Sequence, residues 1–466
     1  MAWMLAALLA IGASRPNIVV VITDDQGYGD IGAHGNPVLK TPNLDRLRAE
    51  GRRFTDFHVS PTCSPTRSAL MTGRHEFKNG VTHTIFERER LAPGAITVAE
   101  ILKAAGYRTG IFGKWHLGDE DAYLPNRRGF GEVFIHGAGG IGQTYQGSCG
   151  DAPGNRYFDP AIWHNDRFVK TKGYCADLFF GQAMRWMDKG GGEPFFCWIA
   201  TNTPHAPLDA RPEDAGRYAG KVAPDVAKFM GMVANIDDNM GRLLDGIKAS
   251  GREKDTLVVF MNDNGGTAGC KVFNAGMRGQ KGTPFLGGTR ASSFWRWPGT
   301  LTPGDIGALA AHVDVFPTLV EIAGVKLEGK AAAQVEGRSL LPLLRDPASP
   351  WEDRHLVTHV GRWPEGKMAD YKYAACSVRT TRWHLVNPDP RGKKGWLLFD
   401  VKADPGERSD IAAANPAQVA AMERHFDGWW DSVQPMMVNE GVRGPAVNPF
   451  KERYWKQFPA EKPAAR

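Results

Sequence analysis

The sequence predicts an α/β protein whose main sheet is mixed, mostly parallel and enclosed by helices. Three uninterrupted apolar runs carry this prediction: Asn17–Ile22 (NIVVVI), Pro194–Thr201 (PFFCWIAT) and Asp255–Asp263 (DTLVVFMND). A strand that is buried on both faces of a parallel sheet is apolar throughout, whereas a half-exposed strand alternates with polar residues. Polar residues follow each run, and the ligands of such sheets bind where the strands end.

Helical segments lie between these runs. Thr41 and Pro42 are typical of the first positions of a helix, which continues through NLDRLRAE and ends at Gly51. A second helix is expected over ITVAEILKAAG, ending at Gly106, and the strand-like segment YRTGIFGK follows it. Helices that alternate with buried strands favour the parallel arrangement.

The pattern changes near Trp351. Short antiparallel strands are predicted at Tyr371–Ala375, Trp383–Val386 and Trp396–Val401, and a helix is predicted to begin at Pro416. A core of this chain length is expected to divide, because hydrophobic cores stop growing at roughly 250–300 residues. We therefore expect a large α/β domain over residues 15–350, which carries the chemistry, and a small C-terminal antiparallel subdomain over residues 351–466.

The composition excludes several classes of protein. With 42% hydrophobic and 23% charged residues among 466, the chain is neither disordered nor a membrane bundle. The net charge of +6 is small for this length and spread along the chain, which argues against a nucleic-acid partner. Six cysteines without a CxxC pair indicate neither a zinc site nor a disulfide scaffold, although Cys149 and Cys175 are candidates for one pair.

Residues 1–14 have features of a signal peptide. Trp3–Ile11 is an apolar run shorter than the roughly 20 residues of a membrane span. Small residues follow at positions 12–14, as at a cleavage site, but a charged segment before the run is missing. We expect a periplasmic or secreted protein without a stable membrane span; the alternative is a cytoplasmic protein whose first residues are no signal.

Two pairs of oxygen-bearing side chains directly follow predicted strands. Asp24 and Asp25 come after the first apolar run, and Asp263 and Asn264 end the third. Adjacent carboxylates repel each other unless a cation or a proton compensates. With no Cys or His beside them, these oxygens suit Ca²⁺ or Mg²⁺ better than zinc. Each pair alone is equally compatible with an ordinary cap or turn.

The remaining polar motifs are cationic and include one unusual cysteine. Cys63 lies in SPTCSPTRSALMTGR, among hydroxyls, prolines and arginines rather than in an apolar run. A cluster of cations with a metal would neutralise a tetrahedral oxyanion, sulfate or phosphate, during transfer. Singly, such residues are most often solvated surface charges or loop residues. The candidates are Arg67, Arg74, Lys114 and His116 (GKWHLG), His205 (TPHAP) and Lys281 (RGQKGTP).

Together these motifs resemble the type I sulfatases of the alkaline phosphatase superfamily. CSPTRSALMTGR is similar to that family's C-x-P-x-R signature, in which the cysteine is oxidised to Cα-formylglycine, and GKWHLG is similar to its second signature. The order of the motifs along the chain also resembles that of sulfatases, from Pro16 to about Ala412, and it closes with DVFPTLVEIAG and FDVKADPGE. The resemblance implies an alkaline-phosphatase-like fold with a small C-terminal sheet, and hydrolysis of aryl or carbohydrate sulfate esters.

The resemblance also implies a metal and a nucleophile. Asp24, Asp25, Asp263 and Asn264 would hold one Ca²⁺, with Mg²⁺ less favoured, and the ion would also touch the formylglycine made from Cys63. The hydrated aldehyde is a geminal diol: one hydroxyl attacks sulfur, and collapse of the other ejects sulfate without a second attack on sulfur. A thiol or a serine lacks this exit route.

Further roles follow from the same resemblance. Arg67 would help to activate the attacking hydroxyl, and His116 would deprotonate the second one. His205 would protonate the leaving oxygen as a general acid, and Lys281 would bind the sulfate and leaving-group oxygens. Lys114 would steady the diol and the transferring group. Arg74 is assigned to orienting the loop from outside the site.

Two positions depart from the family pattern. Leu286, with two glycines after it, stands where many relatives have a glutamate, and Asn262 replaces a serine before Asp263. We expect the missing carboxylate at position 286 to loosen a supporting contact. The glycine-rich segment His136–Gln143 does not fit a phosphate-binding loop and is interpreted as a loop near the mouth of the site.

Two alternative functions stay open at this point. A phosphonate monoester or phosphodiester hydrolase would use the same formylglycine and cations on phosphorus. A non-catalytic binder of sulfated glycans would follow if Cys63 is not converted. The expected partners are a small-molecule or saccharide sulfate ester and a maturation enzyme, either formylglycine-generating or an anaerobic sulfatase-maturating enzyme.

Overall fold

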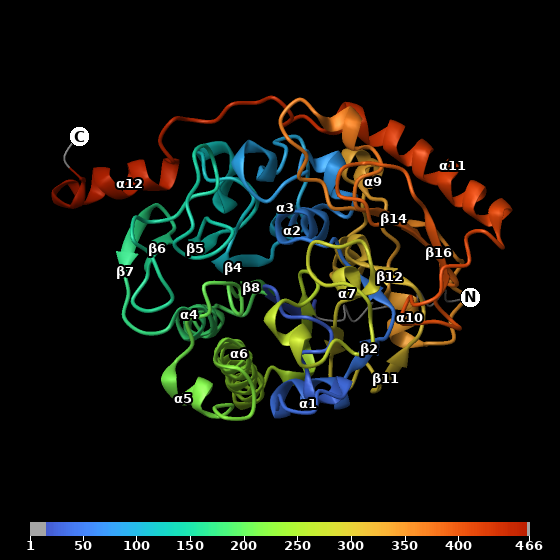
Figure 1. Cartoon of the computed structure of the whole chain (residues 1–466). Coiled ribbons are helices and arrows are strands. Elements are labelled where there is room, and N and C mark those ends of the chain that lie inside the picture. The colour runs from blue at the N-terminus through green and yellow to red at the C-terminus, as the bar shows by residue number, and fades with distance from the viewer. Residues whose placement is uncertain (1–14, 464–466) are drawn as a thin grey trace, which may run out of the picture.

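A ten-stranded mixed sheet runs through the middle of the computed structural model, which describes residues 15–463 (Figure 1). The five central strands, from β9 to β5, are parallel, and antiparallel pairs flank them. This confirms the predicted α/β class. In spatial order the strands are β11 (Gly304–Ile306), β2 (Arg52–Phe54), β10 (Ser293–Arg296), β9 (Thr256–Asn262), β1 (Asn17–Thr23), β8 (Phe195–Ala200), β4 (Arg108–Lys114), β5 (Glu132–His136), β6 (Ala161–His164) and β7 (Arg167–Lys170).

Helices cover both faces of this sheet, which explains why its central strands are apolar throughout. In β1, Ile18 and Val20 join the core on one face, while Val19 and Val21 join the core on the other. The first core also contains residues of α2 (Cys63–Thr72), α3 (Val98–Ala104) and α8 (Val315–Ile322). The second contains residues of α1 (Pro42–Ala49), α4 (Cys175–Asp188) and α6 (Pro224–Ala249).

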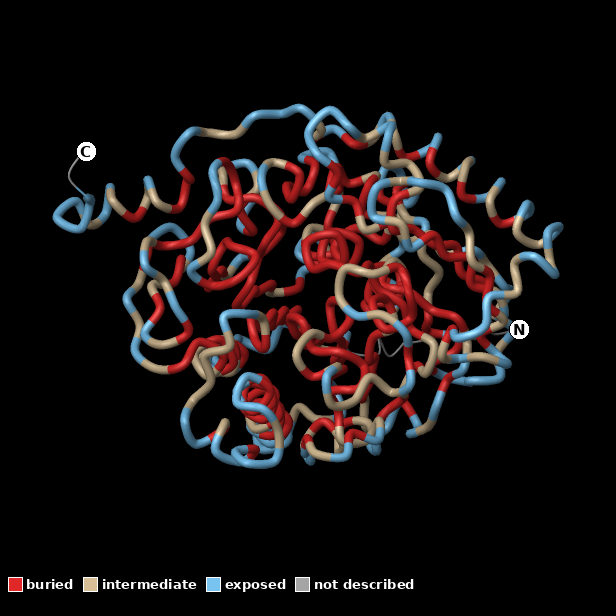
Figure 2. Tube along the Cα trace, viewed as in Figure 1, coloured by how far each residue is buried: buried red, intermediate tan, exposed pale blue. Residues whose placement is uncertain are grey.

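Helix α2 is buried along its whole length, and Figure 2 shows it in red at the centre of the molecule. All ten of its residues are buried, including the polar ones. A polar helix in that position needs partners inside the protein for its side chains. Ser64, Ser68 and Thr72 find theirs in backbone carbonyls. The motif around Cys63 is therefore part of the protein interior.

A separate four-stranded antiparallel sheet confirms the predicted small C-terminal sheet. Tyr371–Ala375 is not one of its strands; it forms a turn, and the strand begins at Cys376. The aromatic residue that suggested a strand, Tyr373, instead stacks on Phe426 with ring centroids 5.6 Å apart. The strands are β13 (Leu356–His359), β14 (Cys376–Arg379), β15 (Trp383–Asn387) and β16 (Leu397–Asp400).

The chain leaves this sheet through two helices. Helix α11 (Pro416–Val433) packs its apolar stripe against β14 and β15. A strap over residues 434–448 then crosses the molecule to α12 (Pro449–Gln457), which lies at the opposite end in Figure 1. There Phe450 stacks near Trp163 and Phe168 of the large sheet. The last segment of the chain thus returns to the large sheet.

The shorter elements connect these layers. β3 pairs with β12 in a two-stranded sheet beside the large one. The bounds are β3 (Phe57–His58), β12 (Ala310–Ala311), α5 (Pro212–Gly216), α7 (Leu286–Thr289), α9 (Gly329–Gln334) and α10 (Leu341–Arg345).

The structure also bears on the cysteine and membrane predictions. All six cysteines are free, so the candidate pair of Cys149 and Cys175 is not formed. Among residues 15–463, no helix has the length and apolar character needed to cross a membrane. The predicted signal peptide, residues 1–14, lies outside the described residues.

A buried glutamate joins the small sheet to the large one. Glu407 accepts a hydrogen bond from the backbone N–H of Leu286 at 2.8 Å, and its other oxygen lies 2.5 Å from Nδ1 of His384. Its carboxylate is fully buried. Around this link, the Leu286 side chain packs with Val386 and Phe399 of the small sheet. The contact is thus both apolar and polar.

Replacing Glu407 by alanine is expected to lower the free energy of unfolding by about 3 kcal/mol, because a buried histidine and a buried N–H lose their partner. Urea unfolding monitored by tryptophan fluorescence measures this. Glu328→Ala is the matched control, since Glu328 pairs with Lys326 only at the surface and its loss is expected to cost less than about 0.5 kcal/mol. Equal unfolding midpoints for the two variants would contradict the proposed link.

Candidate active site

The two predicted carboxylate pairs meet at one edge of the sheet. β1 and β9 are parallel neighbours with Thr23 opposite Asn262, so the residues after each strand lie side by side. The backbone N–H of Asp25 donates to Oδ1 of Asp263 at 3.2 Å, and Nδ2 of Asn264 donates to Oδ1 of Asp25 at 3.0 Å. The side chains of both pairs, Asp24 with Asp25 and Asp263 with Asn264, are buried.

These oxygens fit a hard cation. Oδ1 of Asp24 and Oδ1 of Asn264 are buried and accept no hydrogen bond from any described residue. One oxygen each of Asp24 and Asp263 and the sulfur of Cys63 lie within 4.8 Å of one another. Burial raises the pKa of Asp24 to about 6 although Lys114 lowers it, and burial raises that of Asp263 to about 6 as well. A bound Ca²⁺ would favour the charged form of both carboxylates.

Cys63 is the first residue of α2 and is only 2% exposed. Although burial raises it, the pKa of its thiol is lowered overall because Lys114 and Lys281 lie near. One turn along α2, Arg67 donates two hydrogen bonds to Oδ2 of Asp263, from Nη2 at 2.8 Å and from Nε at 3.2 Å. The helix therefore places the cysteine and an arginine against the carboxylates.

The two predicted lysines reach the same carboxylates from other segments. Lys114, the last residue of β4, donates from Nζ to Oδ2 of Asp24 at 2.7 Å, and both side chains are fully buried. Lys281 forms an ion pair with Oδ1 of Asp25. Although burial alone would raise it, the pKa of Asp25 lies well below its usual range because Lys281 and His205 stand beside it. The cluster is therefore rich in positive charge that faces Cys63.

The two histidines differ in their hydrogen bonds. Nε2 of His116 lies 2.7 Å from the carbonyl oxygen of Thr84, and because a carbonyl only accepts, Nε2 carries the hydrogen. Nδ1 of His116 keeps a free lone pair, and burial lowers the pKa of this imidazole well below its usual value. Nδ1 of His205 donates to the Ala206 carbonyl, which leaves Nε2 3.8 Å from Oδ2 of Asp25. His116 is arranged as a base. Burial lowers the pKa of His205, as do Lys281 and Lys114, although the carboxylate of Asp25 opposes this shift.

Comparison with known proteins assigns this arrangement to a family. Residues 16–325 match the model of the family Sulfatase, and residues 288–426 match the model N-sulphoglucosamine sulphohydrolase, C-terminal. The chain belongs to the sulfatase family. Arylsulfatase A of Bos taurus is 32% identical over 88% of this chain and 86% of its own length. N-acetylgalactosamine-6-sulfatase of Rattus norvegicus is 32% identical over 90% and 85%.

The structural comparison agrees. The crystal structure of Ps i-CgsB in complex with k-i-k-neocarrahexaose matches this sulfatase with a TM-score of 0.81 at 26% identity, over 96% of this chain and 98% of that chain. The predicted alkaline-phosphatase-like fold is confirmed. The relatives are sulfuric ester hydrolases by name, so this chain is an enzyme of the same class.

The structure explains both departures from the family pattern. In place of a carboxylate at position 286, Leu286 packs against the small sheet, and Glu407 supplies a carboxylate to its backbone N–H. Asn262 donates to Oγ1 of Thr23 and accepts from the backbone N–H of Ser292, each at 2.9 Å. Neither residue is placed among the cations of the site, and the loosening expected at position 286 stays a prediction.

The glycine-rich segment lies directly on the two histidines. A side-chain carbon added to Gly139 would lie 2.8 Å from Cε1 of His116, and one added to Gly140 would lie 2.8 Å from Nδ1 of His205. The sequence placed this loop near the mouth of the site without linking it to either ring. Thr84, the partner of His116, was not predicted at all, because it contributes a backbone carbonyl that any residue offers. Arg74 donates to Asn79 at 2.6 Å, away from the carboxylates, as its supporting role requires.

Gly139→Ala is expected to lower kcat/KM for nitrophenyl sulfate by about 100-fold, because the added methyl group displaces the buried His116 ring from its bond to Thr84. Gly94→Ala is the control, since an added carbon there meets no atom within 4 Å. Steady-state kinetics and thermal unfolding are measured on both. Full activity of the Gly139 variant would contradict this prediction and would mean that the loop moves while the His116 ring keeps its position.

Proposed function

We propose that this sulfatase hydrolyses a sulfate monoester to an alcohol and sulfate, using a formylglycine made from Cys63 and one bound Ca²⁺. The observation that carries this proposal is the position of Cys63. It stands at the N-terminus of a buried helix, among three cations and beside carboxylates whose free oxygens suit a metal. A structural cysteine has no need of such surroundings.

The chain's own residues then divide the work. Arg67, Lys114 and Lys281 bind the negative oxygens of the sulfate group and offset the charge that develops as the S–O bond breaks. His205 donates a proton from Nε2 to the oxygen of the departing alcohol, and Nδ1 of His116 accepts the proton that must leave side chain 63 before sulfate is released. Hydrated formylglycine supplies a hydroxyl nucleophile with a second hydroxyl as its exit route.

Calcium is the metal that the ligand set favours. Asp24, Asp25, Asp263 and Asn264 offer only oxygen ligands, at a site whose carboxylates come from two neighbouring strand ends. When bound, the ion would polarise a sulfate oxygen and favour deprotonation of the nucleophile. Mg²⁺ demands stricter octahedral geometry and retains more water, so we rank it second.

Sulfated saccharides are the proposed substrates. One relative is named as an N-acetylgalactosamine-6-sulfatase, and the matched solved structure contains a neocarrahexaose. The N-terminal run predicts export, which suits polymeric substrates found outside the cell. Phosphonate or phosphodiester hydrolysis stays the second enzymatic candidate, because the cation cluster neutralises either oxyanion. Comparing a nitrophenyl sulfate with the corresponding phosphate ester separates the two.

One test of the proposed function concerns the covalent state of Cys63. In protein made with a maturation enzyme, the tryptic peptide Phe54–Arg67 is expected to be lighter by the difference between CH₂SH and CHO, and an aldehyde reagent is expected to label it. Mass spectrometry measures this, and Cys63→Ala is the unlabelled control. An unconverted, unlabelled Cys63 under these conditions would favour the non-catalytic binder.

Another test concerns the metal. Ca²⁺ at a hundredfold excess over its Kd is expected to stabilise the folded protein by about 2.7 kcal/mol, because the unfolded chain has no such site. Asp24→Asn is expected to remove most of this effect, whereas Asp245→Asn, at an exposed ion pair, is expected to retain it. Thermal unfolding with chelator, Ca²⁺ or Mg²⁺ measures the difference. A melting temperature that no divalent cation changes would refute the metal assignment.

A further inference from the structure

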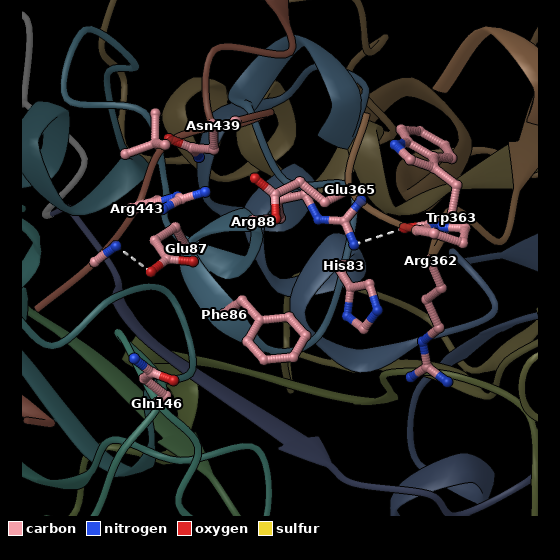
Figure 3. A pocket seen from close by; sticks show the side chains of 14 residues that line it. His83, Phe86, Glu87, Arg88, Gln146, Arg362, Trp363, Glu365, Asn439 and Arg443 are labelled. Atoms are coloured by element: carbon pink, nitrogen blue, oxygen red, sulfur yellow. Dashed lines mark hydrogen bonds between the residues drawn. The ribbon is translucent and has the colours of Figure 1, made fainter. Parts of the chain in front are cut away.

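A cavity opens beside Thr84, the hydrogen-bond partner of His116. It has a volume of about 510 Å³, and four parts of the chain line it: residues 83–88, Gln146, residues 362–365 and residues 439–444 (Figure 3). Residues 83–88 follow α2, residues 362–365 belong to the region of the small sheet, and residues 439–444 belong to the strap before α12. None of the catalytic residues assigned above lines this cavity.

Thr84 connects a residue that lines the cavity with a residue of the active site. The backbone carbonyl of Thr84 accepts the hydrogen bond from His116, and the Oγ1 of Thr84 accepts one from Nη2 of Arg362 at 2.8 Å. His83 and Phe86, on either side of Thr84, face the cavity. The cavity therefore lies next to the residue that holds the His116 ring.

Arg362 is held in place but has no carboxylate partner. Its backbone is left-handed, with φ of +64°, and its N–H donates to the Thr82 carbonyl at 3.0 Å. Among residues 15–463, no carboxylate oxygen lies within 4.0 Å of its guanidinium, whereas Arg88 in the same wall pairs with Glu440 at 3.4 Å. The Arg362 side chain is exposed, and one hydrogen bond, to Thr84, orients its guanidinium. A guanidinium whose other N–H groups are free is suited to bind a carboxylate or a sulfate.

The other charged residues that line the cavity are less suited than Arg362 to bind an anion. Arg443 also has no carboxylate within 4.0 Å in the described chain. Both arginines are exposed, but Arg362 donates to Thr84, whereas the Arg443 guanidinium has no hydrogen-bond acceptor among residues 15–463. Glu87 accepts a hydrogen bond from the backbone N–H of Gly444, and Glu365 is exposed at the rim. Both carboxylates can accept hydrogen bonds from sugar hydroxyls.

Aromatic rings complete a surface for a sugar. Phe86 is 41% exposed and Tyr145 is 39% exposed, and their centroids lie 6.4 Å apart in an edge-to-face pair. The glycine-rich segment that covers both histidines continues to Tyr145 and Gln146, and Gln146 lines the cavity, so the same loop reaches the catalytic rings and the cavity. Exposed aromatic rings of this kind stack on the apolar faces of sugars.

We propose that this cavity binds the part of the substrate beyond the scissile sulfate ester, and that Arg362 is a specificity-determining residue that binds an anionic substituent there. The substituent is a uronate carboxylate or a second sulfate group. This inference rests on the proposed function, and it narrows the substrate class to polyanionic saccharides.

Arg362→Asn is the decisive variant, because asparagine tolerates the left-handed backbone while removing the charge. The measured quantity is the ratio of kcat/KM for a dianionic disaccharide sulfate to kcat/KM for the matching monosulfated neutral disaccharide. Arg362→Asn is expected to lower this ratio at least about tenfold. Arg362→Lys keeps the charge, so its ratio is expected to lie between those of Arg362→Asn and the wild type. Arg424→Ala, at an exposed arginine of α11, is the control and leaves the ratio unchanged.

Two dianionic substrates distinguish the sources of the charge. One carries a uronate carboxylate and the other a second sulfate; a ratio that depends on Arg362 for either supports the proposal and names the group. A ratio that stays at the wild-type value in Arg362→Asn for both would overturn it, whether or not overall activity falls.

Equilibrium binding separates this inference from the proposed function. Cys63→Ala protein is titrated by calorimetry with the same disaccharides, so no turnover is needed. The dianionic compounds are expected to bind at least about tenfold more tightly than the neutral one, and Arg362→Asn in this background is expected to remove the preference. If the wild-type protein with Cys63 shows no sulfatase turnover while this binding preference is present, the result would count against the proposed function alone. Equal binding of all compounds would overturn the role of Arg362.

Discussion

Three buried carboxylates at one sheet edge, each matched by its own cation, are the constraint on which the rest of the structure depends. Removing either member of such a buried pair leaves a charge without its counterion, at a cost of about 3–5 kcal/mol. The pairs tie β1, α2, β4, the end of β9 and the loop of Lys281 to one point, although these segments are far apart in sequence. They are Asp24–Lys114, Asp25–Lys281 and Asp263–Arg67.

The order of the strands makes this convergence possible. β9, β1, β8 and β4 are adjacent and parallel, so their carboxyl ends lie at the same edge and each contributes the polar residues that follow it. Helix α2 adds its N-terminus, where the helix dipole favours negative charge. An oxyanion beside Cys63 is therefore stabilised by backbone dipoles as well as by side chains, before any metal is bound.

Sequence alone predicted the parts of the site that lie where strands end. Apolar runs followed by Asp24 or Asp263 identify an edge of a parallel sheet, and the resemblance to sulfatases supplied the remaining motif residues. Contacts made by backbone atoms or between distant loops were not predicted. The carbonyl of Thr84 has no sequence signature, and the position of Arg362 beside it requires the small sheet to be placed on the large domain. The strand prediction was wrong where an aromatic residue packs against a helix, as Tyr373 does against Phe426.

Residues with a left-handed backbone occur both at the catalytic edge of the sheet and at the cavity beside Thr84. Among the ten described non-glycine residues with positive φ, Asp25 and His116 lie in the site, and Phe86 and Arg362 line the cavity. Each such residue costs of order 1–3 kcal/mol, so it persists only where its surroundings hold it. Asp25 is held through its N–H by Asp263, and Arg362 through its N–H by Thr82. The fold thus holds Arg362 in a conformation in which it lines the cavity, with no carboxylate partner for its guanidinium among residues 15–463.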